Sequence, residues 1–305
     1  MIFPITFSIP EEKINNSVVF KKRMLSSLIP GKVDAYIYEN EEDYYKQYQE
    51  SFFATTFKKA GWDCLRHYEI IANKCIPYFL NIEECPENTM ALFPKNLIIE
   101  GNLLYRKLMN KNINELTKLE IDEYENLLNK LVDYVRNHLT TKKIAEYILE
   151  KTNFRNVSNI LYLSGDTNPD YLRCLTLHGF KELCGVKCHD YPKIPHIYKS
   201  NIINFKNLYG KGMTYSNLLD ENLHNDDADT NIYDDILNKK YDIVIYGSYH
   251  RGMPFYELVN KIYNPNEIIL LCGEDTHCAF TGNFVHYCDY KKGSDKGHNV
   301  FVREL

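Results

Sequence analysis

Three short, nearly continuous apolar runs in the C-terminal half of the chain constrain its fold more than any other feature. They span residues 159–164, 241–246 and 268–272, and the first two are each followed by a loop and then by a helical pattern. Strands that are buried on both faces have this composition, and their alternation with helices is typical of a parallel sheet covered on both sides. The sequence therefore predicts a doubly wound α/β sheet in this half.

The helix expected at residues 171–184 has start and stop signals. Asp170 precedes it and can cap its N-terminus, and Gly185 follows its last apolar residue. We expect four of its apolar side chains to face the core, namely Leu172, Leu175, Phe180 and Leu183. A second helix is expected at residues 255–263, between the second and third apolar runs.

The N-terminal half also mixes strand and helix patterns. Residues 4–10 and 33–38 are expected to be strands, the second of which contains β-branched and aromatic residues. Residues 41–51 are expected to form a surface helix, and Asn88–Leu92 a short helix that stops near Pro94.

Residues 102–152 are expected to be mainly helical. Within them, residues 119–139 carry an apolar stripe with i, i+3, i+4 and i+7 spacing, made by Tyr124, Leu127, Leu128, Leu131, Val132 and Val135. A stripe of this kind indicates a helix that faces the core.

Residues 57–79 combine a basic loop, a short helix and a buried strand. Lys58, Lys59 and a glycine lead into the helix, and the apolar run at residues 75–79 is short enough to be a strand. Backbone N–H groups at a helix start attract anions, and the lysines add positive charge to that field. The segment therefore has the features of a site for phosphate and sugar groups.

The part of this segment from Arg66 to Phe79 reads Arg-His-Tyr-Glu-x-x-Ala-x-x-Cys-Ile-Pro-Tyr-Phe. It resembles the donor-site segment of GT-B glycosyltransferases, in particular exostosin-like enzymes and related enzymes of bacteria and giant viruses. The resemblance implies that Glu69 holds the ribose of a nucleotide-sugar. Lys74 stands where the family usually has a glycine. The segments 163–173 and 247–252 are also similar to parts of these enzymes.

The resemblance further implies two Rossmann-like doubly wound halves with the site between them. We expect a donor-like α/β half with a helical extension at residues 1–153 and a second Rossmann-like half at residues 154–305, joined by a helical segment. In the family the donor half usually comes second. The order is therefore either permuted here, or the chain is part of a longer architecture.

Six residues of the first half are candidates for donor binding: Lys58, Lys59, Gly61, Arg66, His67 and Glu69. The lysines would neutralise a diphosphate, because the leaving group departs with negative charge; the alternative is a solvated surface pair. Arg66 would pair with phosphate or bridge to Asp63 or Glu69. His67 is either a ligand or a packed core histidine.

The loops after the first two apolar runs supply the remaining candidates. For donor binding these are two glycines, which let a backbone approach a ligand closely, and one arginine: Gly165, Gly247 and Arg251. An inverting transferase also requires a base towards the acceptor hydroxyl, and the candidates are His250, Asp166 and Asp170. The alternatives are a helix cap for Asp170 and a salt bridge for Arg251.

We expect no metal site. The Cys and His groups Cys184, Cys188 and His189, and His277, Cys278, His286 and Cys288, contain no Cys-x-x-Cys pair. Asp227-Ala228-Asp229 has the form of the Asp-x-Asp motif of metal-dependent GT-A transferases, but it lies in an acidic run without a preceding strand. We expect it to be a solvated loop, within a polar, partly mobile surface excursion at residues 201–235.

Two further loop patterns bear on the ligand. The loop Gly273–His277 also follows an apolar run, and its acidic pair is either part of the site or a helix cap. No Gly-x-Gly-x-x-Gly occurs between a strand and a helix, which counts against a dinucleotide site.

Composition limits the classes of function. A chain of 305 residues can hold two domains, and a net charge of −5 argues against a general nucleic-acid binder. The nine cysteines have no regular spacing, and no leader segment is recognisable, so we expect reduced thiols in the cytoplasm, which is the host cytoplasm if the protein is viral. No stretch approaches the ~18 apolar residues of a membrane span.

These patterns favour a glycosyltransferase that moves a sugar from a nucleotide-sugar to a hydroxyl acceptor on a glycan or glycoprotein. The nucleotide-sugar is a co-substrate, and no tightly bound cofactor is expected. Two alternatives stay open. One is a non-catalytic module that binds nucleotide-sugars or glycans for a larger transferase system, and the other is a Rossmann-type enzyme that uses NAD or S-adenosylmethionine.

Overall fold

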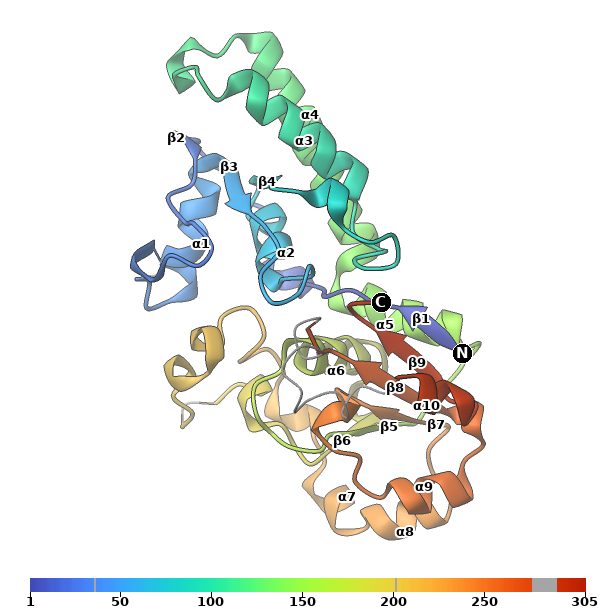
Figure 1. The fold of residues 1–305 in the computed structure, drawn as a ribbon. Helices are drawn as coiled ribbons and strands as arrows, with labels where there is room; N and C mark the ends of the chain where they lie inside the picture. The colour runs from blue at the N-terminus through green and yellow to red at the C-terminus, as the bar shows by residue number, and fades with distance from the viewer. Residues whose placement is uncertain (36, 201, 276–289) are drawn as a thin grey trace.

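The computed structural model describes residues 1–35, 37–200, 202–275 and 290–305. The chain forms two α/β units, which lie one above the other in Figure 1. The larger unit contains a six-stranded parallel sheet with the order β1-β9-β8-β7-β5-β6. Its strands are β1 (Ile2–Pro4), β5 (Ile160–Leu163), β6 (Cys188–Tyr191), β7 (Ile243–Tyr246), β8 (Ile268–Cys272) and β9 (Asn299–Val302). The three apolar runs thus form β5, β7 and β8, as predicted.

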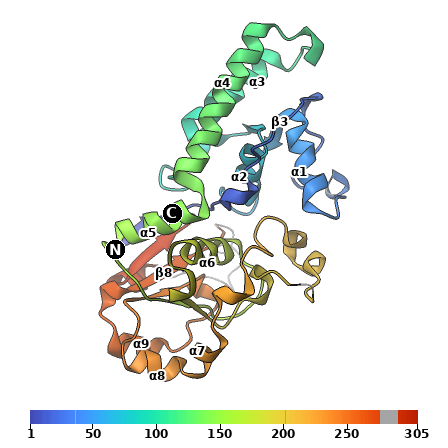
Figure 2. The ribbon, with the colours of Figure 1, turned by 180° about the vertical axis from the view of Figure 1, so that it is seen from behind.

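Helices cover both faces of this sheet, and Figure 2 shows α5 and α6 above the strands and α8 and α9 below them. Successive residues of β5 point to opposite faces. Ile160 and Tyr162 belong to the hydrophobic cluster of α5 and α6, whereas Leu161 and Leu163 belong to the cluster of α8 and α9. The helices are α5 (Thr141–Lys151), α6 (Tyr171–Cys184), α8 (Ile232–Leu237), α9 (Tyr256–Ile262) and α10 (Tyr290–Asp295). The prediction of a parallel sheet covered on both faces is confirmed.

The termini of α6 also follow the sequence signals. The Asp170 carboxylate accepts a hydrogen bond of 3.0 Å from the Arg173 N–H, which satisfies one of the free donors at the helix start. Gly185 ends the helix with a φ of 56°, a conformation that costs glycine little because it has no Cβ.

The smaller unit is built on a three-stranded parallel sheet with the order β2-β3-β4. The strands are β2 (Arg23–Leu25), β3 (Ser51–Thr56) and β4 (Ile76–Phe79), and the helices are α1 (Glu41–Gln49), α2 (Leu65–Ala72), α3 (Lys95–Leu108) and α4 (Lys118–Tyr134). α3 and α4 form the long helical hairpin at the top of Figure 1. All six residues of the predicted apolar stripe, from Tyr124 to Val135, are buried, so this prediction is confirmed.

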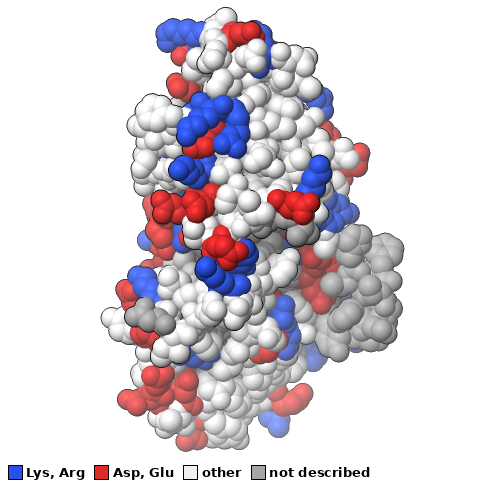
Figure 3. Space-filling model, turned by 90° about the vertical axis from the view of Figure 1, so that its left-hand side faces the viewer, with Lys and Arg blue, Asp and Glu red and all other residues white. Residues whose placement is uncertain are grey.

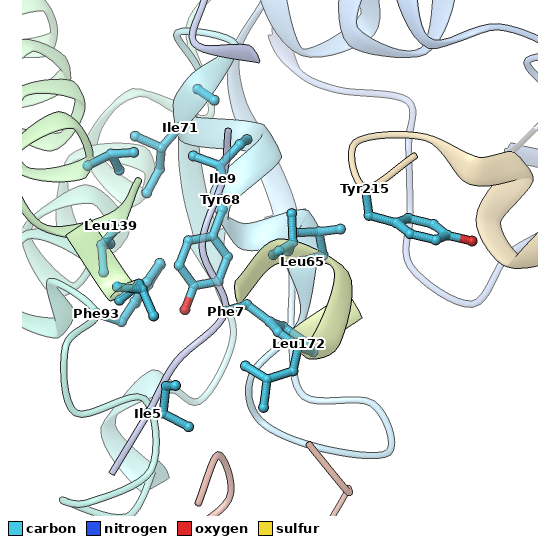
Figure 4. Close-up of a cluster of buried hydrophobic side chains, with 14 of the residues drawn as sticks. Ile5, Phe7, Ile9, Leu65, Tyr68, Ile71, Phe93, Leu139, Leu172 and Tyr215 are labelled. Carbon is cyan, nitrogen blue, oxygen red and sulfur yellow. The ribbon is translucent and has the colours of Figure 1, made fainter. Parts of the chain in front are cut away.

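The two units share one hydrophobic core. The chain crosses between them at Ile9 and again at Thr140, where the segments run side by side: the Ile9 N–H donates to the Leu139 carbonyl and the Thr141 N–H to the Ile9 carbonyl, both at 3.0 Å. Figure 4 shows Phe7 at this junction with Leu65 of α2 and Leu172 of α6. β1 pairs with β9, so residues 2–4 lie in the sheet of the larger unit although they precede residue 153.

Several expected elements differ from the structure. Residues 33–38 are no strand, since Val33–Ala35 form a 3₁₀ turn and residue 36 lies outside the described residues. Asn88–Leu92 form turns, and Pro94 precedes α3 rather than ending a helix. Of the strand expected at residues 4–10, only Pro4 lies within β1.

The prediction of a surface excursion at residues 201–235 is partly wrong. Thr214, Tyr215 and Leu219 are buried against the remainder of the chain. The acidic part forms α7 (Asp226–Thr230) and the start of α8, which lie against the larger unit in Figure 1.

Candidate functional site

A cavity of about 730 Å³ lies between the two units. Its walls are the starts of α2 and α6, the loops that follow β5, β7 and β8, and residues 209–213. The loops leave the carboxyl ends of parallel strands, and β5 and β7 are neighbours at the point where the strand order reverses. This is the usual place for a ligand in an open α/β sheet.

The cavity brings six of the sequence-predicted residues together. They are Lys59, Gly61, Arg66 and Glu69 of the smaller unit and Asp170 and Arg251 of the larger one. The other six do not line it: Lys58, His67, Gly165, Asp166, Gly247 and His250.

Glu69 is a buried carboxyl in the cavity wall. The Tyr44 hydroxyl donates to its Oε2 at 2.8 Å, and the Thr214 hydroxyl donates to its Oε1 at 2.6 Å. Burial raises the pKa of Glu69, although both hydrogen bonds and Arg66 oppose that shift. Each oxygen keeps a second lone pair, so the carboxylate can accept further hydroxyl donors.

The N-terminus of α2 opens into the cavity. Cys64 stands at the N-cap without a side-chain hydrogen bond to the helix, and Cys64, Leu65 and Arg66 all line the cavity. Lys59 is exposed at the same wall. Lys58 does not join it, because its Nζ lies over the Trp62 ring, 5.1 Å from the centroid. A helix N-terminus and two cations therefore border one side of the cavity, where an anion is stabilised.

Asp170 and Asp166 are held in ion pairs with arginine. Arg251 Nε lies 2.7 Å from Asp170 Oδ2, and Arg173 Nη1 lies 3.0 Å from Asp166 Oδ1. Burial alone would raise the pKa of each carboxyl, but the arginines and backbone N–H groups outweigh it, so both pKa values are lowered. This geometry gives Asp170 the helix-cap role and Arg251 the salt-bridge role, and leaves both carboxylates poor proton acceptors.

The two histidine candidates are neutral and lie away from the cavity lining. His67 is fully buried, with Nδ1 2.9 Å from the Thr56 hydroxyl and Nε2 2.9 Å from the Trp62 carbonyl, and burial lowers its pKa to about 3. It therefore packs as a core histidine. Burial also lowers the pKa of His250 to about 4, and its buried Nδ1 has no hydrogen-bond partner among the described residues.

The three predicted glycines make close contacts within the protein. A Cβ on Gly165 would overlap the Arg251 carbonyl, and a Cβ on Gly247 would overlap the Tyr162 ring. A Cβ on Gly61 would overlap the Glu304 carboxylate. The glycines at the ends of β5 and β7 are therefore explained by loop packing, whereas Gly61 borders both the cavity and a carboxylate.

Arg303 organises a charged cluster at the cavity that sequence analysis missed. The side chain is 1% exposed, and its Nη1 donates to the Asp63 carbonyl at 2.6 Å and to Glu304 Oε1 at 2.8 Å. Its Nη2 pairs with Asp275. No motif marked Arg303, which lies 240 residues from Asp63 in the sequence.

Asp63 is a second cavity-lining carboxyl whose pKa is raised by burial. Its side chain accepts hydrogen bonds from the Phe7 N–H at 2.6 Å and the Tyr68 hydroxyl at 2.8 Å. Burial raises the pKa of Asp63 to about 7, against the opposing effect of Arg303. A carboxyl that titrates near neutral pH in a cavity is a candidate for acid–base chemistry.

Residues 209–213 form a further wall that the sequence did not predict. Tyr209 is 70% exposed, and its ring centroid lies 5.7 Å from that of Tyr171. Lys211 donates to the Tyr38 carbonyl at 2.7 Å, so this segment also contacts the smaller unit. The aromatic rings at this wall are suited to stacking on a planar or sugar group.

Among the described residues, Cys184, Cys188 and His189 do not come together as a possible metal site. The described clusters that could hold a metal ion contain only histidine and carboxylate side chains, and His277, Cys278, His286 and Cys288 lie outside the described residues. Six described cysteines are free thiols, as expected, but Cys272 is disulfide-bonded. In the loop after β8, Gly273 and Asp275 line the cavity, and His277 is not described.

No protein-family model matches the chain, and neither the curated proteins nor the solved structures include a match. Among the described residues, no helix is both long and apolar enough to cross a membrane. On the face shown in Figure 3, basic and acidic side chains are interspersed rather than gathered into a single basic surface.

Proposed function

We propose that the protein is a glycosyltransferase with a GT-B-like arrangement, which transfers a sugar from a nucleotide-sugar to a hydroxyl acceptor. The observation that carries the proposal is the interdomain cavity, into which Glu69, Arg66 and Lys59 project from one unit and the Asp170–Arg251 pair from the other. Its volume of about 730 Å³ is that of a site for one substrate-sized ligand.

The chemistry of the lining supports a nucleoside diphosphate as the donor's leaving group. The N-terminus of α2, Lys59 and Arg66 provide positive charge on one side, which would stabilise a departing diphosphate without a metal ion. The Glu69 carboxylate is suited to accept the ribose hydroxyls. The rings of Tyr171 and Tyr209 offer a surface for the base or the sugar.

Asp63 replaces His250, Asp166 and Asp170 as the preferred acceptor base. The acceptor hydroxyl would lose its proton to the Asp63 carboxylate, attack the sugar carbon and release the nucleotide. The pKa of Asp63, raised by burial to about 7, suits this role at neutral pH. The ion-paired Asp166 and Asp170 have lowered pKa values, which makes them weaker bases.

Calorimetric titration with UDP-, GDP-, TDP- and CMP-sugars, with and without Mn²⁺, tests the proposal. One nucleotide class should bind, and Mn²⁺ should not change its Kd. Lys59→Ala should weaken that binding by about 10-fold or more, because a charge-assisted contact to phosphate is lost. Lys58→Ala is the matched control, since Lys58 lies over Trp62, and should leave the Kd unchanged. If no nucleotide class binds, the proposal is wrong.

A non-catalytic binding module is the second candidate. It is favoured by the ion-paired state of Asp170 and Arg251 and by the position of His250 outside the cavity lining. Donor binding without hydrolysis or transfer to any member of an acceptor panel would support this candidate. Transfer that is abolished by Asp63→Asn, with the donor Kd retained, would exclude it.

A further inference from the structure

A second polar cluster lies in the larger unit, outside the cavity lining. It joins three residues: His189 of β6, His224, which lies just before α7, and Asp229 of α7. One possible ligand atom from each of them lies within 4.8 Å of the other two. His189 Nε2 is 3.0 Å from Asp229 Oδ1, and His224 Nε2 is 3.3 Å from Asp229 Oδ2. Two imidazoles and a carboxylate thus converge on one point from β6, from the turn before α7 and from α7.

Two of these atoms are buried without a hydrogen bond. His189 is 4% exposed, and neither its Nε2 nor Asp229 Oδ1 has a hydrogen-bond partner among the described residues. They lie 3.0 Å apart, but an N–H on the ring would not point at the carboxylate oxygen. A buried polar atom without a partner destabilises the folded state. A cation between the two atoms would remove that cost for both.

His224 is oriented by a second carboxylate. Its Nδ1 lies 3.0 Å from Asp190 Oδ1, which leaves Nε2 directed at the cluster. Asp190 is itself fixed by Lys181 at 2.8 Å and by the Tyr198 hydroxyl at 2.7 Å. Histidines that bind metals commonly have their other ring nitrogen held by a carboxylate in this way.

We propose that His189, His224 and Asp229 bind one divalent transition-metal ion of the zinc class. Two imidazole nitrogens and one carboxylate form a donor set that zinc prefers. Separations of 3.0 and 3.3 Å between donor atoms match the edges of a tetrahedron with metal–ligand bonds of about 2.0–2.1 Å. Asp226 Oδ1, 3.5 Å from His224 Nε2, or a water molecule would complete the coordination.

The role of this ion is structural. It would tie α7 to the edge strand β6, and no ligand residue lines the cavity. The site differs from the sequence patterns around it. The sequence groups His189 with Cys184 and Cys188 and predicts a solvated loop for Asp229, whereas in the fold His189 and Asp229 lie side by side.

The test removes metal from the whole chain with a chelator and then adds ZnCl₂ or CoCl₂. One equivalent of Zn²⁺ should bind, and a hundredfold excess over the Kd should raise the Tm by roughly 3–5 °C. Co²⁺ should give the visible absorption of a tetrahedral site. Asp229→Asn should lose both the rise in Tm with Zn²⁺ and the Co²⁺ absorption. Asp227→Asn removes the same charge from the same helix and should keep both.

His224 held as an imidazolium between Asp190 and Asp229 is the competing arrangement, and it needs no ion. Absence of stoichiometric Zn²⁺ binding and of a cobalt spectrum in the wild-type protein would establish that arrangement and overturn the proposal. Equal loss of zinc in Asp227→Asn and Asp229→Asn would also overturn it. The wild-type cobalt spectrum decides the question even if Asp229→Asn fails to fold.

Discussion

The Thr214 hydroxyl donates a hydrogen bond of 2.6 Å to Glu69 Oε1, across 145 residues of sequence and between the two units. Thr214 is fully buried, and its hydroxyl also lies against that of Tyr45. The carboxyl that we assign to ribose binding is therefore positioned by a residue of the other unit.

Replacement of Thr214 by valine should destabilise the protein and weaken donor binding together. Valine keeps the shape of the side chain but leaves Glu69 with one hydrogen bond fewer in a buried site, at a cost of about 1–3 kcal/mol. Urea unfolding and donor titration measure the two effects. Thr230→Val, at an exposed position of α7, is the control. Unchanged unfolding in Thr214→Val would contradict the role given to this contact.

Asp63 should make stability depend on pH between about 4 and 7. Its pKa is raised from 3.8 to about 7 by burial, so the folded protein holds a proton that the unfolded chain releases, and stability falls as the pH rises through this window. In Asp63→Asn the amide oxygen can still accept from the Phe7 N–H, and the amide NH₂ can donate to the Tyr68 hydroxyl oxygen. This variant has no ionisable group at position 63 and should lose part of the decrease in stability. Unfolding free energies at pH 5 and pH 8 measure it.

The control for this experiment is Asp133→Asn, at a position 69% exposed. In this variant the unfolding free energy should change between pH 5 and pH 8 by the same amount as in the wild-type protein. The same difference in Asp63→Asn would mean that another group, such as Glu304, whose pKa is also raised by burial, holds the proton.

Gly165→Ala should destabilise the larger unit by about 1–3 kcal/mol, since the added methyl group would overlap the Arg251 carbonyl and force the two loops apart. Thermal unfolding measures the loss. At Gly31, with a φ of 84° and open space around the missing Cβ, alanine should cost only about 1 kcal/mol of backbone strain. An equal effect at both positions would argue against loop packing as the reason for Gly165.

The α4 stripe gives a packing prediction. Leu131 is fully buried and Leu119, on the same helix, is 76% exposed. Leu131→Ala should cost about 2–5 kcal/mol because it leaves a cavity in the shared core, whereas Leu119→Ala should stay within about 0.5 kcal/mol. Denaturant unfolding compares the two. A small loss at Leu131 would mean that the helical hairpin is uncoupled from the core.

Sequence patterns predicted the elements in which the spacing of apolar residues directly reflects which side chains are buried. β5, β7 and β8 are apolar on both faces, and the α4 stripe is periodic, so both were found. β6 was missed because His189 and Asp190 are polar residues of a buried strand. Asp190 is paired there with Lys181, His224 and Tyr198. That partnership is visible only in three dimensions.

The candidate site was predicted in part for the same reason. Arg66 and Glu69 lie in one local motif, so sequence alone could place them together. Asp63, Arg303 and Thr214 become neighbours of that motif only through the fold, and no spacing marked them. His67 was ambiguous because a packed histidine and a ligand histidine have the same local sequence.

The pairing of β1 with β9 has a consequence for the way this chain is made. Ile2 lies beside Val300 and Pro4 beside Val302. The edge strand β1 can therefore pair with β9 only after almost 300 further residues have been synthesised. Contacts between residues so far apart in the sequence slow folding, because the chain loses the entropy of loop closure before the strand pairing can stabilise the fold. Until β9 has been synthesised, Ile2 and Phe3 remain an unpaired apolar segment that can associate with wrong partners.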